Sequence, residues 1–412
     1  MAKKSQGSPE PYTVQWRLCV EGPSQRRNGF KELGLMNADS SLPKPLLEVR
    51  DLRVEFRVSG SAAAGDGSKE ARPRGGGVWA LRALDGVDIS LYEGEILGLV
   101  GESGSGKTVF TLALLRLIQQ PGRIAAGQII WQGRDLLPLD EREMRKIRGR
   151  EMAIIFQNPQ LSLNPVRTAG SQLTAVLRLH HGISSHQASE QAVHWLREVG
   201  VPDPERVLGA YPHELSGGLC QRMMIAMALS CRPKLLIADE PTAALDVTIQ
   251  AQIMDLLLEL RQRYGMAILL VSHDLGLIAR LCDRIAVLYL GRIVEVAAAT
   301  ELYDSPLHPY TQALLRAVPV PDPHHREKLQ VLEGEPPNQL RLPRGSCRFL
   351  GRCPVAVDRC RSTDPPLTTV NSTAHQVACV HYAEAGYPSP AGMKDGEKQE
   401  GESIPPSVRR AL

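Results

Sequence analysis

The segment EGEILGLVGESGSGKTVFTLALLRLI, residues 93–118, holds a short apolar run, a glycine-rich loop and a second apolar stretch. The loop fits the pattern G-x-x-x-x-G-K-[S/T] between a predicted strand and a predicted helix, which is the context that a phosphate-binding loop requires. Glycines let backbone N–H groups curl around phosphate oxygens, and the start of the helix adds positive potential. A chance match in a glycine-rich turn is the alternative, and the flanking strand and helix argue against it. The residues expected to contact the phosphates are Gly101, Glu102, Ser103, Gly104, Ser105, Gly106, Lys107 and Thr108.

Strands and helices alternate along the chain from residue 78 to about residue 300. Continuous apolar strands separated by helices are typical of a parallel α/β sheet that is covered on both faces. A hairpin with its turn near Gly291 is expected to close this region. The predicted elements are strands at 46–58, 95–101, 234–240 and 266–273, helices over 246–264 and 275–282, and a mainly helical stretch over 168–232.

Composition divides the chain into parts of different character. Both ends are rich in polar residues, proline and glycine, which predicts flexible or disordered segments. Beyond the α/β region, prolines recur, apolar runs become short and four cysteines appear. The expected parts are a flexible extension at 1–44, an α/β domain at 45–305 with a helical subdomain at about 160–232 and a linker-like loop at 60–77, a small cysteine-containing domain at 306–385, and a disordered tail at 386–412.

The overall composition excludes several classes of protein. A formal net charge of +3 and an aromatic content of 4% argue against a nucleic-acid partner. No apolar run approaches the roughly 18–20 residues of a membrane-spanning helix, and the polar start of the chain does not resemble a signal peptide. We therefore expect a protein that stays in the cytosol, where disulfides are rare.

The segment KLLIADEP, residues 234–241, is an apolar strand that ends in two carboxylates. Asp239 is expected to hold the Mg²⁺ together with the Thr108 hydroxyl, while Glu240 polarises a water for in-line attack on a γ-phosphate. An Asp-Glu pair after a strand is by itself more often the start of a helix. The phosphate loop upstream favours the catalytic interpretation.

The segment ELSGGLCQR, residues 214–222, resembles the signature sequence of ATP-binding-cassette (ABC) ATPases. In that family two such domains dimerise head to tail, and the signature of one closes over the ATP held by the other. A hydroxyl and bare N–H groups at a helix start suit contact with a γ-phosphate, so the resemblance assigns this role to Ser216, Gly217 and Gly218. A Gly-Gly turn capped by Ser216 is the alternative for these four residues alone. The resemblance covers about residues 46–385 and implies a P-loop nucleotide-binding domain with a parallel sheet core, an antiparallel β-subdomain and a helical subdomain.

Further positions match the family one by one. Gln157 resembles the glutamine that senses the γ-phosphate, adds a ligand to the Mg²⁺ and couples to the membrane partner. His273 resembles the switch histidine at the γ-phosphate, and residues 243–246 resemble the loop that crosses the dimer interface. Phe56 is similar in position to the aromatic residue that stacks on adenine.

Two residues depart from the family pattern. Leu219 stands where glutamine or methionine is common, and Cys220 stands where arginine is usual in the nearest relatives. The missing charge at Cys220 predicts a weaker ATP site shared with the partner, with a neutral substitution as the alternative. The chain's own phosphate site, with Glu240 intact, is expected to be hydrolytic.

Three stretches indicate one branch of the family. Residues 238–257, residues 305–319 and the cysteine cluster resemble the ATPase subunits of dipeptide and oligopeptide importers. The resemblance implies a second, related ATPase subunit in a heterodimer, two integral-membrane permease subunits, a solute-binding protein outside the membrane, and a peripheral place on the cytoplasmic face of the inner membrane. The alternatives are an importer ATPase for nickel or another small solute, and a soluble ABC ATPase that is not coupled to transport.

Four cysteines follow the hairpin region: Cys347, Cys353, Cys360 and Cys379. They are either small packing residues or, in a cytosolic α/β protein, ligands of a metal or cluster. Structural zinc usually uses C-x₂₋₄-C pairs, whereas the gaps here are five, six and eighteen residues. The wider spacing favours a [4Fe–4S] cluster, which the dipeptide branch carries at matching cysteines. Zn²⁺ is the alternative, with His375 and His381 as substitute ligands.

Overall fold

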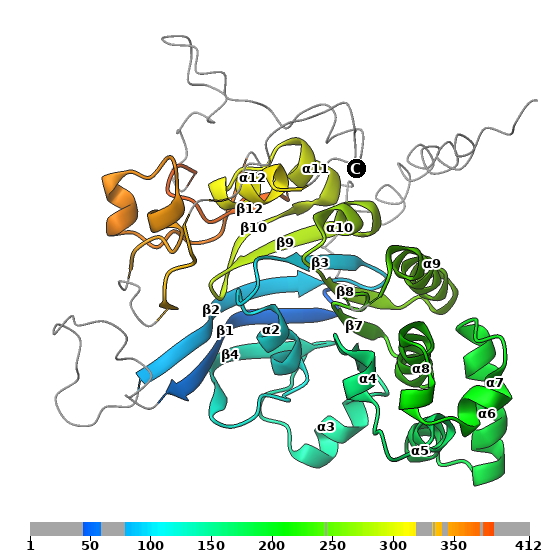
Figure 1. The fold of residues 1–412 in the computed structure, drawn as a ribbon. Coiled ribbons are helices and arrows are strands. Elements are labelled where there is room, and N and C mark those ends of the chain that lie inside the picture. The colour runs from blue at the N-terminus through cyan, green and yellow to red at the C-terminus, as the bar shows by residue number, and fades with distance from the viewer. Residues whose placement is uncertain are drawn as a thin grey trace, which may run out of the picture. The chain divides into compact units, whose positions relative to one another are not determined.

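The computed structural model describes residues 44–58, 79–243, 245–318, 332, 334–339, 345–370 and 374–382. The predicted extension before residue 44, the linker-like loop at 60–77 and the tail at 386–412 lie outside these residues. Within the described part, the strands form an eight-stranded sheet and a four-stranded sheet (Figure 1). This architecture is the expected α/β arrangement with a separate antiparallel sheet.

The larger sheet carries the phosphate loop at the end of one of its central strands. Its order is β11-β12-β10-β9-β3-β8-β7-β6. β3 is parallel to β8 and β9, and β7 is parallel to β6 and β8. The strands are β3 (Ile96–Val100), β6 (Met152–Ile155), β7 (Leu235–Asp239), β8 (Ala267–Val271), β9 (Arg284–Tyr289), β10 (Arg292–Ala298), β11 (Thr368–Thr369) and β12 (Gln376–Val377). The predicted hairpin is confirmed, because β9 and β10 pair antiparallel around Gly291.

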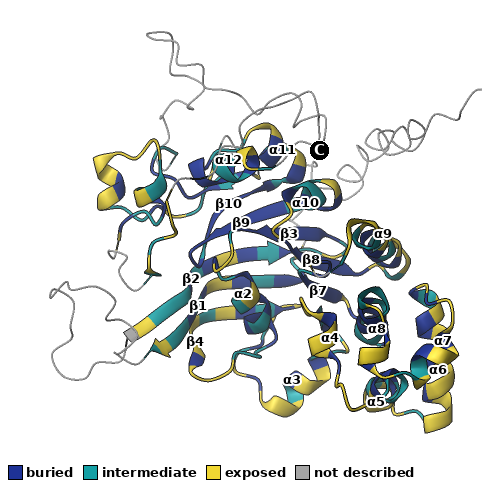
Figure 2. Cartoon of the chain, in the orientation of Figure 1, coloured by how far each residue is buried: buried dark blue, intermediate teal, exposed yellow. Residues whose placement is uncertain are grey.

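The central strands are buried on both faces, as their continuous apolar sequences predict. Alternate side chains of a strand point to opposite faces, and along β7 they enter two different cores. Leu236 and Ala238 face the core that contains α8 (Gly217–Leu229) and α9 (Val247–Tyr264), whereas Leu235 and Ile237 face the core beneath the smaller sheet. Figure 2 shows these strands as buried, with exposed residues on the outer sides of the helices.

The smaller sheet is antiparallel, with the order β2-β1-β4-β5. The predicted strand at 46–58 is confirmed as its central β1. Its elements are β1 (Leu47–Val58), β2 (Trp79–Leu91), β4 (Gly122–Trp131) and β5 (Arg134–Asp135). Helix α2 (Lys107–Leu114) packs between the two sheets, because Phe110, Ala113 and Leu114 share one core with both of them.

Most helices begin at a residue whose side chain accepts a backbone N–H, the pattern that polar N-cap residues produce. Thr168, Ser184, Ser216 and Asp246 cap α5, α6, α8 and α9 in this way. The predicted helices over 246–264 and 275–282 and the helical stretch over 168–232 are confirmed. Among the described residues, the α-helices other than α2 are α3 (Glu141–Ile147), α4 (Pro159–Ser162), α5 (Ala169–His181), α6 (Ser185–Glu198), α7 (Pro204–Gly209), α8 (Gly217–Leu229), α9 (Val247–Tyr264), α10 (Leu275–Leu281), α11 (Ala299–Asp304) and α12 (Pro309–Arg316).

The C-terminal region joins the larger sheet instead of standing apart from it. β12 pairs with β10 through Glu295↔Val377 and Val296↔Gln376, and β11 pairs with β12. The short helices η6 (Leu350–Arg352) and η7 (Asp358–Arg361) carry the cysteine-rich stretch, and η4 (Pro212–Glu214) precedes α8.

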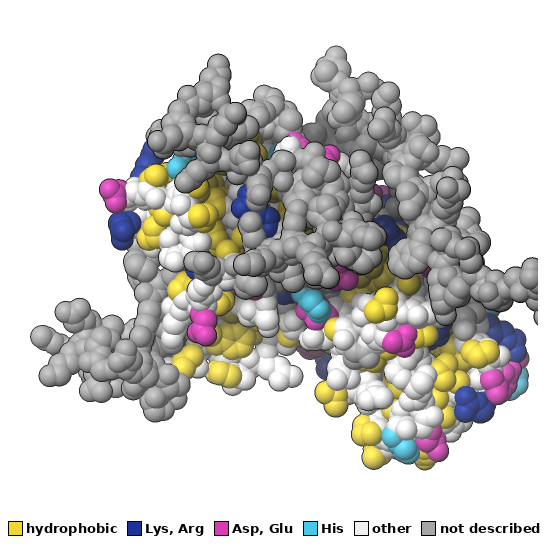
Figure 3. Space-filling view, turned by 45° about the horizontal axis from the view of Figure 1, so that its top comes forward, with side chains coloured by type: hydrophobic (Ala, Val, Ile, Leu, Met, Phe, Trp, Pro, Cys, Tyr) yellow, Lys and Arg dark blue, Asp and Glu magenta, His cyan; other side chains and the backbone are white. Residues whose placement is uncertain are grey.

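Charged side chains are scattered on the described part of the face drawn in Figure 3. In Figure 3 acidic, basic and hydrophobic side chains are interspersed over the part of this face that the structure describes. None of the described helices has both the length and the apolar character needed to cross a membrane.

Candidate functional site

The phosphate loop connects the end of β3 to the start of α2. Close packing of the backbone requires glycine at positions 101 and 106. A Cβ at Gly101 would overlap the carbonyl oxygen of Leu288, and a Cβ at Gly106, where φ is 110°, would lie 2.7 Å from the carbonyl oxygen of Ala83. The loop is therefore held against β9 and β2 by contacts that only glycine permits.

Lys107 is buried at the first turn of α2 and bonds to the loop itself. Its Nζ donates to the carbonyl oxygens of Gly101, at 2.8 Å, and Glu102, at 3.1 Å. Burial lowers the pKa of the Lys107 ammonium, although the carboxylates of Glu240, Asp239 and Glu102 oppose that shift. The position of the ammonium thus depends on how the Gly101 and Glu102 carbonyls are oriented.

Asp239 ends β7, two strands away from β3, and lies beside α2. Its Oδ2 accepts a hydrogen bond from Thr111 Oγ1 at 3.1 Å. Burial raises the pKa of the Asp239 carboxyl, which the hydroxyls of Thr111 and Thr108 oppose. Its Oδ1 is buried without any hydrogen-bond partner, and so is the hydroxyl of Ser105. An unpartnered buried carboxylate oxygen is costly, and a hard cation such as Mg²⁺ would satisfy Asp239 Oδ1, so this carboxylate fits that ion.

Glu240 follows Asp239 and brings three polar side chains together. Gln157 Nε2 donates to Glu240 Oε2 at 2.7 Å, and His273 Nδ1 lies 3.4 Å from Glu240 Oε1. Glu240 has a positive φ of 47°, an uncommon conformation outside glycine that is concentrated at functional sites. Residues that are 83 and 33 positions from Glu240 in sequence therefore meet at one carboxylate.

Comparison with known proteins identifies the family to which this chain belongs. The family model for ABC transporters matches residues 84–243, and the model for the oligopeptide/dipeptide transporter C-terminal region matches residues 294–360. The dipeptide transport ATP-binding protein DppD of Escherichia coli (strain K12) is 48% identical over 311 residues, which cover 75% of this chain and 94% of that protein. The oligopeptide transport ATP-binding protein OppD of Salmonella typhimurium is 45% identical over 336 residues, which cover 81% of this chain and 94% of that protein.

A solved dimeric ATP-binding cassette, MJ0796 bound to ADP and Pi, matches with a TM-score of 0.51 and 27% identity, covering 61% of this chain and 98% of that one. The chain belongs to the ABC ATPases. Within this family it falls in the group of dipeptide and oligopeptide transport ATP-binding proteins.

The ABC signature residues lie against a different segment from the chain's own phosphate loop. Ser216 caps α8, and its hydroxyl accepts the N–H of Leu219 at 3.3 Å. A Cβ at Gly217 would touch Leu245, and one at Gly218 would touch Ile249. These contacts place the signature beside the segment after Glu240 that was expected to cross a dimer interface.

The expectation for Cys220 needs revision. Its side chain is 0% exposed and lies in the core, with Sγ 3.5 Å from the carbonyl oxygen of Pro212. Burial raises the pKa of the thiol. The Cys220 side chain points into the core and not to the surface at the start of α8. The exchange of arginine for cysteine therefore removes no charge from the exposed face of the signature. An arginine there would have to be buried or displace the helix.

Phe56 lies on β1, opposite Gly122 of β4. The ring packs against the core of the smaller sheet, and its edge is close enough to Gly122 that a Cβ there would lie 2.6 Å from it. Its role at adenine stays a prediction, since it is part of the packing of β1 on β4.

The four cysteines of the C-terminal region are neighbours. The N–H of Cys347 donates to the carbonyl oxygen of Cys360 at 2.9 Å. Burial raises the pKa of Cys379 to about 12, and the charges of the other three thiolates add to that shift. The described cysteines form no disulfide. In the described ranges no set of three or more His, Cys, Asp or Glu side chains has an arrangement that would hold a metal ion.

The two histidines expected as substitute ligands have other partners. His375 Nε2 lies 2.7 Å from Glu295 Oε1, and its Nδ1 lies 3.3 Å from Glu301 Oε1. His381 Nε2 lies 3.0 Å from the carbonyl oxygen of Val355. His375 therefore belongs to a buried ion pair with β10, which argues against a role as a metal ligand.

Sequence reasoning missed one residue of the magnesium region. Thr111 holds Asp239 Oδ2 and lies one helical turn after Thr108 on α2. The i, i+3 spacing, which places two threonines on one face of the helix, was the signal that could have found it.

Proposed function

We propose that this ABC ATPase hydrolyses ATP at the site formed by the phosphate loop, Asp239 and Glu240, and that hydrolysis drives uptake of dipeptides or oligopeptides. The observation that carries the proposal is the meeting of Gln157 and His273 at the Glu240 carboxylate, next to the buried, unpartnered Asp239 Oδ1. An attacking water needs a base and orienting groups beside the metal ion, and these four side chains supply them.

Each residue then has a definite task. Lys107 Nζ keeps its bonds to the Gly101 and Glu102 carbonyls and donates its third N–H to the phosphate oxygens, and backbone N–H groups at the start of α2 donate to the same phosphates. Thr108, Asp239 and Gln157 would hold Mg²⁺, and the bound ion would supply positive charge to neutralise the phosphates. Glu240 takes a proton from water as the water oxygen bonds to the γ-phosphorus and the bond to ADP breaks. His273 contacts the γ-phosphate.

The peptide cargo is inferred from the relatives and from the C-terminal region. Proteins at 45–48% identity carry dipeptide or oligopeptide transport in their names. The C-terminal match at residues 294–360 is to the oligopeptide/dipeptide transporter region. These observations favour a peptide over nickel as the solute.

The assembly is inferred in the same way. A signature that packs beside residues 245–249, instead of over its own phosphate loop, suits a head-to-tail dimer in which it meets the partner's ATP. We propose a heterodimer with a second ABC ATPase, two membrane permease subunits above it, a solute-binding protein outside, and a peripheral place on the cytoplasmic face of the inner membrane.

The test of the catalytic assignment is Glu240→Gln in the assembled transporter. We expect lost ATP turnover with retained ATP binding, because the amide keeps the bond to Gln157 and loses the basic oxygen. Glu259→Gln, which removes an exposed acid on α9 paired with Arg263, is the matched control and should retain turnover. Unchanged hydrolysis in Glu240→Gln would refute the assignment.

The test of the cargo is the identity of the chains that purify with this one, followed by uptake into vesicles. Two membrane permeases and stimulation of ATP hydrolysis by a peptide-loaded binding protein are expected. Stimulation of ATP hydrolysis by Ni²⁺ and not by peptide would instead support the nickel-importer alternative.

We also propose that Cys347, Cys353, Cys360 and Cys379 hold a [4Fe–4S] cluster. The support is the set of four cysteines within residues 347–379 and the backbone bond from the Cys347 N–H to the Cys360 carbonyl oxygen, and binding of a cluster would require these side chains to rearrange, because the described residues show no arranged metal-binding group. Anaerobically purified protein should contain iron and sulfide at about four each per chain. Colourless protein with one equivalent of zinc would replace the cluster by the zinc alternative.

A further inference from the structure

Glu102, the second residue of the phosphate loop, is bound through its side chain, its N–H and its carbonyl. Its carboxylate receives both terminal nitrogens of Arg352, with Oε2 at 2.8 Å and Oε1 at 3.0 Å. Its N–H donates to the Tyr310 hydroxyl at 2.9 Å, and its carbonyl oxygen accepts from Lys107. Tyr310 and Arg352 come from the C-terminal region, 208 and 250 positions away.

The Arg352–Glu102 pair has the geometry of a strong contact. Two parallel N–H···O bonds between a guanidinium and a carboxylate give both orientation and energy. The Arg352 side chain is 6% exposed and that of Glu102 is 26% exposed, so solvent screens the pair only partly. The hydrogen bond to Glu102 is the main reason that the pKa of Arg352 is raised.

An aromatic cluster fixes both partners of Glu102. The ring centroids of Tyr289 and Tyr310 are 4.5 Å apart, and Phe349 contacts both rings at 5.4 Å and 5.5 Å. Phe349 is 1% exposed and lies three residues before Arg352 in the same turn. The Tyr289 hydroxyl also accepts from Arg352, at 3.5 Å. These contacts leave Arg352 little freedom to move away from the loop.

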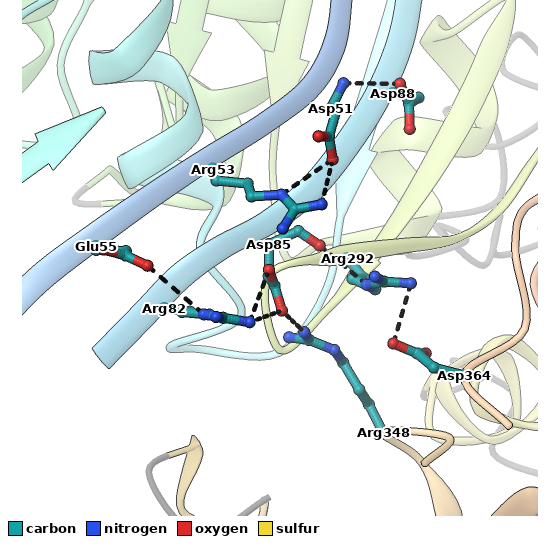
Figure 4. A network of polar contacts seen from close by, with 9 residues as sticks. All are labelled: Asp51, Arg53, Glu55, Arg82, Asp85, Asp88, Arg292, Arg348 and Asp364. Carbon is teal, nitrogen blue, oxygen red and sulfur yellow. Dashed lines mark hydrogen bonds and ion pairs between the residues drawn. The ribbon is translucent and has the colours of Figure 1, made fainter. Parts of the chain in front are cut away.

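A second arginine fastens the same stretch without touching the phosphate loop. Arg348 binds Asp85 of β2 and the carbonyl oxygen of Leu290, and nearby Arg292 pairs with Asp364 at 3.1 Å (Figure 4). Docking of the C-terminal region and contact with the phosphate loop therefore depend on different side chains.

We propose that Arg352, helped by Tyr310, is a positioning residue that holds the phosphate loop in its nucleotide-binding form through Glu102. The pair has two effects on a bound nucleotide. It fixes the Glu102 carbonyl that locates Lys107, and it neutralises a carboxylate that would otherwise face the incoming phosphates. The C-terminal region thus sets the nucleotide affinity of the ATPase site. The inference rests on the proposed use of residues 101–108 as that site.

The experiment measures binding of Mg²⁺-ADP, which is not hydrolysed, to the purified full-length chain. Arg352→Gln should weaken binding about tenfold, the effect of losing a charge-assisted pair of this kind. Arg348→Gln is the matched control. It removes the other buried arginine of the stretch, and it should lower the melting temperature while changing the affinity less than about twofold.

A double-mutant cycle separates the contact from a general structural effect. If Arg352 acts through Glu102, adding Arg352→Gln to Glu102→Gln should cost much less affinity than Arg352→Gln costs alone. Additive losses, or equal losses in Arg352→Gln and Arg348→Gln, would overturn the inference. Failure of the unmodified chain to bind Mg²⁺-ADP would instead refute the proposed nucleotide site.

Discussion

His308 should make the protein less stable in mild acid. The residue caps α12, and its Nδ1 accepts the N–H of Tyr310 at 3.0 Å, so the ring must be neutral at that nitrogen. Complete burial lowers the pKa of His308 to about 4, and the nearby Glu295 carboxylate opposes that shift only in part. Protonation therefore favours the unfolded chain, in which the ring titrates normally.

The size of the effect follows from linkage. His308 has a pKa near 6.5 in the unfolded chain and about 4 in the folded protein, so at about pH 7.5 its titration does not reduce the free energy of unfolding. At about pH 5 the unfolded ring is almost fully protonated while the folded ring is not, which removes about 2 kcal/mol of unfolding free energy. The loss grows as the pH falls from 6.5 towards the folded pKa.

The assay compares the full chain with His308→Asn by denaturant unfolding at both pH values. Asparagine is a favourable N-cap residue that does not titrate, so it preserves the cap and removes the proton. The smaller side chain lowers the free energy of unfolding equally at both pH values. This effect cancels when the change between the two pH values is compared for the two proteins. His375, whose pKa is raised, titrates in both proteins and cancels as well. Equal loss of stability in the two proteins between the two pH values would refute the argument.

Three further outcomes are expected. Gly106→Ala should weaken Mg²⁺-ADP binding at least about tenfold, because its Cβ would lie 2.7 Å from the Ala83 carbonyl oxygen; calorimetry with normal affinity would contradict this. Asp239→Asn should reduce the stimulation of ATP turnover by Mg²⁺ at least about tenfold, and an unchanged Mg²⁺ titration would remove Asp239 from the metal site. His375→Ala should destabilise the fold by about 3–5 kcal/mol, since it leaves the fully buried Glu295 without its cation. That stabilising contribution is present below pH 6.5 and fades as the pH rises through the raised pKa of His375, so the difference between the urea unfolding curves of the two proteins should become smaller in alkali.

Local sequence was sufficient to predict most of the catalytic domain. Periodicity and apolar runs identified β3, β7, β8, α9 and the β9–β10 hairpin, since each of these segments shows its burial in its own residues. The phosphate loop was equally clear, because its glycines, lysine and threonine form one contiguous pattern between β3 and α2.

Contacts between distant segments were beyond the reach of such reasoning. Nothing in the sequence around Arg352 indicates that it pairs with Glu102, and the HPYTQALL stretch showed a family resemblance but not the bond from Tyr310 to the loop. The burial of Cys220 was also missed, because a position two residues after a Gly-Gly pair at a helix start gives no sign of which way its side chain faces.

The pairing of β12 with β10 has a consequence for solubility. A strand at the edge of a sheet offers unpaired N–H and C=O groups to any other chain, and short or covered edges prevent such association. β12 covers β10 with only two residues, Gln376 and Val377, aided by the bond from the Ala378 N–H to the Val294 carbonyl oxygen. Beyond β12, the two-residue β11 is too short to recruit a further strand. The C-terminal strands therefore act as a guard against self-association, and a chain that ends before residue 374 would expose the apolar β10 to its own copies.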